Sequence, residues 1–205
     1  MGSVKLSDDF YDKIKLRLYQ HVGRELSLAN HVLDIGCGNC ELAKYLSQTN
    51  GQKVIGIDTS SESFPDKEKI SKDWQLVKCI HRSASRLDVI QNEAIDAVVM
   101  FSSLHEMNYP KAVLQQVYSV LRPGGKVLIV EFPNKSLAQK LWNEKYFSKE
   151  QLMKYLDDAG FEHIQARLIE NKQILWVNGY SCAKNKNKSE QVKIKVYETR
   201  KNVHI

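Results

Sequence analysis

Residues 32–40 read Val32-Leu33-Asp34-Ile35-Gly36-Cys37-Gly38-Asn39-Cys40, an apolar strand that runs into an acidic residue and a turn with two glycines. A helical pattern begins near Glu41, so unpaired backbone N–H groups at its start can face a ligand. Gly36 and Gly38 let the backbone approach that ligand where a Cβ atom would clash, and Asp34 can accept hydrogen bonds from hydroxyl or ammonium groups. The stretch predicts a nucleotide-type binding loop, although an ordinary tight strand-to-helix turn could carry the same residues.

Strand and helix patterns alternate on both sides of this loop. Strands are expected near 31–35, 53–57, 75–81, 95–101 and 125–132, with helices near 40–49, 65–72, 84–90 and 110–121 between them. A further helix, capped by Ser7 with Asp8 and Asp9, is expected to run to about Leu28 before the first strand. This alternation predicts an α/β fold with a parallel sheet.

The pattern changes after the fifth strand. Ser148 and Gln151 form a capping-box pair that begins a helix, and Gly160 is placed to end it. Two extended segments follow at 161–170 and 173–183, and the short polar turn between them is typical of an antiparallel hairpin. We expect residues 1–183 to form one domain that includes the N-terminal helix, and residues 184–205 to form a basic linker and an extra C-terminal strand.

Composition indicates a soluble protein of the cytoplasm. The 205 residues suffice for one α/β domain, and no apolar run is long enough to span a membrane. The four cysteines are expected to be buried free thiols; Cys37 and Cys40 have the spacing of a metal or redox pair, but no second pair stands nearby. From Lys184 onward, seven Lys or Arg and two Asp or Glu account for +5 of the net charge of +6. We therefore expect no metal, and basicity confined to the tail.

Four motifs now stand in order along the chain: Asp34-x-Gly36-x-Gly38, Val54-Ile55-Gly56-Ile57 closed by Asp58, Ile95-Asp96-Ala97-Val98-Val99, and Leu121-Arg122-Pro123-Gly124-Gly125-Lys126. Over about residues 30–183 the chain resembles the class I S-adenosylmethionine-dependent methyltransferases, and it is most similar to the type 11 group, which includes quinone-biosynthesis methyltransferases. The resemblance implies a Rossmann-like, mostly parallel sheet of seven strands with helices on both faces and a final antiparallel hairpin. It also implies an enzyme that uses S-adenosyl-L-methionine.

Each cofactor-binding position has a chemical reason. Asp58 closes the second strand and can accept both ribose hydroxyls of an adenosyl group. A nicotinamide enzyme would use the same acid but needs a third glycine where Glu41 stands. In the adenine loop, where relatives usually carry an Asp, Ser83 and Ala84 can still offer hydrogen bonds, and Asp88 could substitute as the acceptor. The full set of cofactor-binding residues expected is Asp34, Gly36, Cys37, Gly38, Asp58, Thr59, Ser83, Ala84 and Phe101.

Methyl transfer requires alignment in a dry site more than it requires a base. His105 is the best candidate for a general base, although it could instead hold its turn through backbone hydrogen bonds. Glu106 is a second candidate, or a helix-starting acid, and Tyr11 could cover the cofactor or merely pack. We expect the acceptor, a flat or apolar small molecule, to bind among the late aromatic residues Trp142, Tyr146, Phe147, Trp176 and Tyr180.

Two other functions remain open at this point. The Lys-rich tail is compatible with an RNA methyltransferase, although no Asn-Pro-Pro-Tyr-type motif follows the fourth strand, where Ser102-Ser103-Leu104 stands. The altered adenine loop is compatible with a non-catalytic binding or regulatory partner. The C-terminal strand could also pair with a second copy and form a homodimer.

Overall fold

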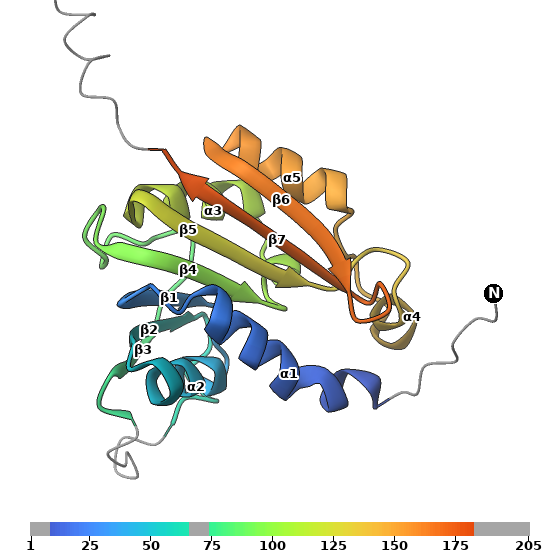
Figure 1. Ribbon diagram of the computed structural model, residues 1–205, viewed down its shortest axis with the longest axis horizontal. Helices are drawn as coiled ribbons and strands as arrows, with labels where there is room; N and C mark the ends of the chain where they lie inside the picture. Colours follow the sequence, from blue (N-terminus) through green and yellow to red (C-terminus); the bar gives the residue numbers. More distant parts are fainter. Residues whose placement is uncertain (1–8, 66–73, 183–205) are drawn as a thin grey trace, which may run out of the picture.

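A computed structural model describes residues 9–65 and 74–182 (Figure 1). Its seven strands are β1 (His31–Ile35), β2 (Lys53–Asp58), β3 (Val77–His81), β4 (Ile95–Phe101), β5 (Leu121–Glu131), β6 (Phe161–Ile169) and β7 (Ile174–Ser181). They form one sheet in the order β3-β2-β1-β4-β5-β7-β6, in which β7 runs antiparallel to β5 and β6 and the other pairs are parallel. The predicted Rossmann-like architecture is confirmed.

Helices cover both faces of this sheet. On one face, α1 (Phe10–Glu25) and α2 (Glu41–Asn50) bury apolar side chains such as Leu18 and Leu46. On the other face, α3 (Pro110–Val120) and α5 (Lys149–Asp158) bury Val117 and Leu156. The short helices α4 (Leu137–Trp142) and η3 (Leu104–Glu106) lie in connections that follow β5 and β4. The strands β1, β4 and β7 inside the sheet are almost entirely buried, whereas the edge strands β3 and β6 are partly exposed.

Helix α5 and the hairpin of β6 and β7 form where the local sequence signals predicted them. The Ser148 hydroxyl accepts a hydrogen bond from the backbone N–H of Gln151 at 3.1 Å, so the capping predicted for α5 is present. Gly160 ends that helix in a left-handed conformation, with φ of +94°. The hairpin turn at 170–172 has positive φ at all three residues, and it joins β6 to β7 as predicted.

Several expected elements differ from the structure. Residues 84–90 form turns and not a helix, because the Ser83 hydroxyl accepts from the backbone N–H of Ser85 and competes with helical hydrogen bonding. Helix α1 ends at Glu25, and Leu28, which was expected to end it, is 93% exposed beyond the apolar stripe. Helix α4 was not expected. The Ser7 cap, the helix at 65–72 and the strand in 184–205 lie wholly or almost wholly outside the described residues.

Two of the four motifs hold the edge of the sheet that lies opposite the carboxyl ends of the parallel strands. The Asp96 carboxylate accepts hydrogen bonds from the backbone N–H groups of Asn30 (2.7 Å) and His31 (2.8 Å) and pairs with Arg122 Nε at 2.9 Å. Burial alone would raise the pKa of Asp96, but these bonds and the Arg122 charge lower it below its usual value. The third and fourth motifs therefore tie β1, β4 and β5 together at this edge of the sheet.

The cysteines depart from the expectation of four free thiols. Cys40 and Cys79 are joined by a disulfide, while Cys37 remains a buried free thiol with its sulfur 3.5 Å from that of Cys40. The glycine at position 56 makes room for this packing, since a Cβ there would lie 2.8 Å from the Cys37 sulfur. The expectation of free thiols is therefore wrong for Cys40 and Cys79, whose disulfide is a bond that persists mainly in oxidising compartments.

Within residues 9–65 and 74–182, no group of His, Cys, Asp or Glu side chains is arranged to hold a metal ion. The same part of the chain contains no helix with the length and apolar character needed to cross a membrane.

Candidate functional site

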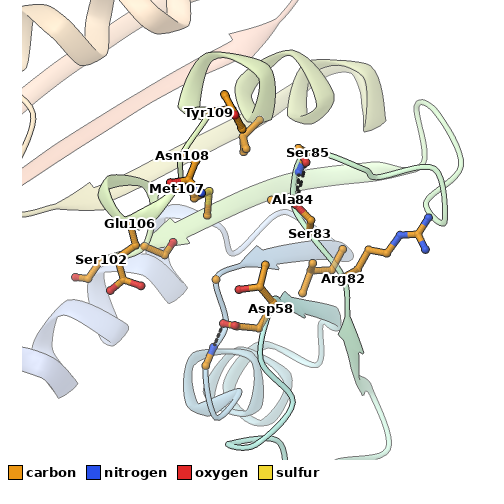
Figure 2. A pocket seen from close by; sticks show the side chains of 16 residues that line it. Asp58, Arg82, Ser83, Ala84, Ser85, Ser102, Glu106, Met107, Asn108 and Tyr109 are labelled. Carbon is orange, nitrogen blue, oxygen red and sulfur yellow. Dashed lines mark hydrogen bonds between the residues drawn. The ribbon is translucent and has the colours of Figure 1, made fainter.

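A cavity of about 470 Å³ opens at the carboxyl ends of β1, β2, β3 and β4, the edge where open α/β sheets bind ligands (Figure 2). Its walls come from the loop after β1, the end of β2, the turn after β3 and the segment between β4 and α3. The lining residues are Gly36, Gly38, Ile57, Asp58, Thr59, Arg82, Ser83, Ala84, Ser85, Ser102, Ser103, Glu106, Met107, Asn108, Tyr109 and Val113.

The two glycines of the loop after β1 have different reasons to be glycine. Gly36 has φ of +72°, and a Cβ there would lie 2.3 Å from the Cβ of Ser103, whose hydroxyl donates to the Ile35 carbonyl at 2.7 Å. Gly38 has φ of +50°, but its Cβ would meet no atom within 4 Å. Gly36 is therefore required by packing between the loop and the β4 end, whereas Gly38 keeps the loop backbone bare beside the cavity.

Asp58 lies at the centre of the cavity wall. One carboxylate oxygen accepts from the backbone N–H of Gly38 at 2.8 Å (Figure 2), and the other accepts from that of Ser60 at 3.0 Å. Each oxygen of a carboxylate has two acceptor sites, so both can accept one further bond from a ligand hydroxyl. The acid thus shapes the loop and still offers a pair of acceptors to the cavity.

Asp34 sits behind the loop and does not line the cavity. Its side chain is buried, and burial together with the charge of Asp58 raises the pKa of Asp34 to about 7. A cationic group bound near the loop would stabilise the charged form of this carboxyl. The protonation of Asp34 can therefore respond to the charge of a bound ligand although its side chain does not line the cavity.

The turn after β3 forms the end of the cavity where adenine was expected. Ser83 and Ala84, which were predicted to bind the adenine, line it, and the Ser83 hydroxyl lies 2.9 Å from that of Ser85. Asp88, considered as a substitute acceptor, instead pairs with the Arg82 guanidinium and is absent from the cavity wall. That expectation is wrong because the residues between them form a turn, which brings Asp88 back toward Arg82.

Two predicted cofactor contacts are not part of the cavity wall. The Cys37 sulfur packs against Gly56 and Cys40 behind the loop. The Phe101 ring turns to the opposite face of the sheet and meets Tyr19 edge-on, with ring centroids 5.2 Å apart. Both side chains pack against residues outside the cavity lining and do not face the cavity. Thr59, by contrast, lines the cavity as predicted.

Of the three predicted catalytic residues, Glu106 alone lines the cavity. Its pKa is raised by burial, and the nearby Glu144 charge adds to this effect although that of His105 opposes it. The imidazole of His105 is not part of the cavity wall and faces Glu131 and Glu144. The Tyr11 hydroxyl accepts from the backbone N–H of Ala138 at 2.8 Å and so holds α1 against α4.

The late aromatic residues lie in three different places. Trp142 and Tyr146 belong to a cluster with Tyr11, Phe132 and the His105 imidazole, in which neighbouring ring centroids lie 4.6 to 6.3 Å apart. Phe147 packs on Tyr155 of α5. Trp176 is buried in the core, and the ring of Tyr180 lies against Lys126, so neither lines the cavity. None of the five late aromatic residues lines the cavity, so the cavity is not the aromatic acceptor pocket that the sequence indicated.

The cavity residues that were not among the predicted site residues are Ile57, Arg82, Ser85 and Val113 and, after β4, Ser102, Ser103, Met107, Asn108 and Tyr109. Ser102 adopts a left-handed conformation, with φ of +51°, that turns the chain sharply after β4. The position of the last five residues after the fourth strand was a usable signal, but no residue type among them indicates a particular chemistry.

Comparison with known proteins agrees with this geometry. Residues 33–129 match the sequence model of a family described as a methyltransferase domain. An O-methyltransferase of Aspergillus sclerotiorum is 27% identical over 119 residues, which are 56% of this chain and 45% of that protein. A demethylmenaquinone methyltransferase of Oceanobacillus iheyensis is 33% identical over 103 residues, 48% of this chain and 43% of that protein. The chain thus spans less than half the length of these two curated relatives.

Solved structures share the fold. The crystal structure of the 1,6-didemethyltoxoflavin-N1-methyltransferase of Burkholderia thailandensis, with 1,6-didemethyltoxoflavin and S-adenosylhomocysteine bound, matches with a TM-score of 0.63. The two chains are 18% identical, and the match covers 89% of this chain and 94% of the other. This match shows the fold, and the family match over residues 33–129 agrees with the resemblance to the type 11 methyltransferases that the motifs indicated.

Proposed function

We propose that this chain, whose residues 33–129 match the model of the methyltransferase domain family, transfers a methyl group from S-adenosylmethionine to a small-molecule acceptor. The observation that carries the proposal is the cavity at the carboxyl edge of the sheet, where the bare backbone of Gly38 and the carboxylate of Asp58 face one space. Demethylmenaquinone, named for one relative, is a small molecule, which supports an acceptor of that class.

The residues of the cavity fit an adenosyl ligand. Asp58 would accept from both ribose hydroxyls, and Ser83 with the Ala84 backbone would bind the adenine ring. When bound, S-adenosylmethionine supplies an electrophilic methyl group whose bonding electrons stay on sulfur. The chain's own contribution is to orient the acceptor beside Glu106 and to exclude water with Met107 and Tyr109.

Neither alternative gains support from the described residues. The Lys-rich tail that favoured RNA lies at 184–205, outside them, and so does the strand that was expected to form a homodimer. The altered adenine loop lines the cavity with Ser83 and Ala84, so a non-catalytic role is not required to explain it. A homodimer through the tail stays a prediction.

Calorimetry with S-adenosylhomocysteine tests the proposal directly. We expect saturable 1:1 binding to the full chain, with NAD⁺ at the same concentration giving no heat because the loop lacks the third glycine of a dinucleotide site. If S-adenosylhomocysteine does not bind at millimolar concentration, the proposed cofactor is wrong.

Binding should also depend on pH through Asp34. Its raised pKa of about 7 means that the free protein holds a proton there at acid pH, and a ligand ammonium group near the loop would displace it. We therefore expect affinity for S-adenosylhomocysteine to rise from pH 5 to pH 7, by at most about tenfold per pH unit for one linked proton, and to level off above pH 7.

The matched variants are Asp34→Asn and Asp157→Asn. The first should abolish the pH dependence between 5 and 7, while the second, an exposed acid on α5, should retain it. A flat affinity profile in the parent protein would contradict a linked proton at Asp34.

A further inference from the structure

His105 is held by carboxylates on both ring nitrogens. Nδ1 lies 2.8 Å from an oxygen of Glu131, and Nε2 lies 3.1 Å from an oxygen of Glu144. The imidazole is 5% exposed. The two carboxylates differ, because the Glu131 side chain has no exposed surface and that of Glu144 is 49% exposed.

Glu131 fixes the orientation of the ring. It ends β5, and its second oxygen accepts from the backbone N–H groups of Leu104 (2.7 Å) and His105 (3.2 Å). One buried carboxylate therefore holds the backbone of η3 and the imidazole that projects from it. An ionised carboxylate can only accept hydrogen bonds, so the Nδ1 that faces it carries a proton.

Glu144 is the partner of His105 that a ligand could displace. It lies between α4 and α5, in residues 143–148, which have no regular secondary structure. The oxygen that faces Nε2 also accepts from the Tyr146 hydroxyl at 2.9 Å. Exposed ion pairs contribute little to stability, so a ligand oxygen could displace this carboxylate at small cost.

Nε2 is close to the cavity. An oxygen of Glu106, which lines the cavity, lies 3.9 Å from Nε2. An atom that replaced the Glu144 carboxylate would thus stand beside the cavity wall, within reach of the imidazole and of the Tyr146 hydroxyl.

We infer that the Glu144 carboxylate occupies the place of an ionisable hydroxyl on the acceptor, and that Glu131 is the positioning residue that holds His105 to receive that hydroxyl's proton. The inference rests on the proposed function and gives the acceptor a class, a phenol or enol methylated on oxygen. The O–H bond breaks, its proton goes to Nε2 of neutral His105, and its electron pair stays on the oxygen that attacks the methyl carbon. The imidazolium that forms is stabilised by Glu131.

The charges around His105 agree with this arrangement. Burial lowers its pKa, but the hydrogen bond to Glu131 and the charges of Glu131, Glu106 and Glu144 together raise it above the usual value. The other titratable group against the ring is Tyr146, whose own pKa is raised by burial and by Glu144. While the Glu144 carboxylate faces Nε2, that nitrogen carries a proton as well. Displacement of Glu144 removes one of the carboxylates that favour the imidazolium, so the Nε2 proton is lost to solvent as the acceptor binds and the neutral base is left to receive the acceptor's proton.

Nuclear magnetic resonance of the imidazole nitrogens in the ¹⁵N-histidine-labelled full chain can test this. We expect the His105 pKa to fall in Glu144→Gln, with the proton on Nδ1 retained in the neutral form. In Glu131→Gln the preference for a proton on Nδ1 should be lost, and Glu131→Asp should restore part of it. Glu150→Gln, an exposed glutamate on α5, is the matched control and should change nothing.

Binding of phenol and of benzylamine then distinguishes an acceptor that is methylated on oxygen from one that is methylated on nitrogen. With S-adenosylhomocysteine present, phenol should shift the Nε2 signal of His105, and its apparent Kd should be at least threefold lower in Glu144→Gln than in the parent. Benzylamine should leave the signal unchanged. If phenol fails to shift Nε2 in Glu144→Gln, or benzylamine shifts it equally, the inference is wrong. Failure of S-adenosylhomocysteine to bind in calorimetry would instead overturn the proposed function, while the pKa and proton position of His105 remain measurable without any ligand.

Discussion

Replacing Asp58 by alanine is expected to weaken binding of S-adenosylhomocysteine by about 100-fold or more, since two hydrogen bonds to a charged acceptor contribute at least about 3 kcal/mol together. The variant also leaves the backbone N–H groups of Gly38 and Ser60 without their acceptor, so the loop that shapes the cavity loosens. Calorimetry on both proteins at one pH measures the loss.

Two controls separate ligand binding from general damage. Asp58→Asn keeps an acceptor oxygen of the same size and should lose less affinity than alanine. Asp158→Ala removes an exposed acid of α5 that pairs with Lys154 and should bind the ligand as the parent does. Parent-like affinity in Asp58→Ala would mean that this acid does not hold the ribose.

Gly36→Ala is expected to lower the free energy of unfolding by about 2 to 5 kcal/mol, from overpacking and from the left-handed conformation at a residue with a Cβ. The new Cβ would lie 2.3 Å from that of Ser103 and 2.7 Å from its hydroxyl oxygen. Relief of that clash would move the loop away from the end of β4, so S-adenosylhomocysteine binding should be lost as well. Urea unfolding and calorimetry test the two effects.

Gly38→Ala is the matched comparison. It shares the positive φ but has open space at the Cβ position, so we expect a smaller loss of stability, about 1 to 2 kcal/mol. Its methyl group would project beside the cavity, so ligand affinity should fall while the fold persists. Equal destabilisation in both variants would show that backbone conformation alone decides the cost and that the contact with Ser103 does not matter.

Local sequence signals were sufficient to predict most of the helices, strands and turns. The apolar run before Asp34, the capping box at Ser148 and the turn at 170–172 each act within a few residues, and each was predicted and found. The turn at residues 84–90 was misread as a helix because its apolar residues Leu87 and Ile90 face the core at a spacing that helices also use.

The loop after β1, the acid that ends β2 and the direction of the sheet followed from sequence alone, because each depends on residues adjacent in the chain and on the rule that parallel strands present their carboxyl ends at one edge. The tertiary structure decided which way the side chains after β4 turn. It turned Glu106 to the cavity and His105 to Glu131 and Glu144, and it joined Cys40 to Cys79. These contacts join residues 26 to 39 positions apart, and no local pattern specifies them because only packing of the complete sheet brings the partners together.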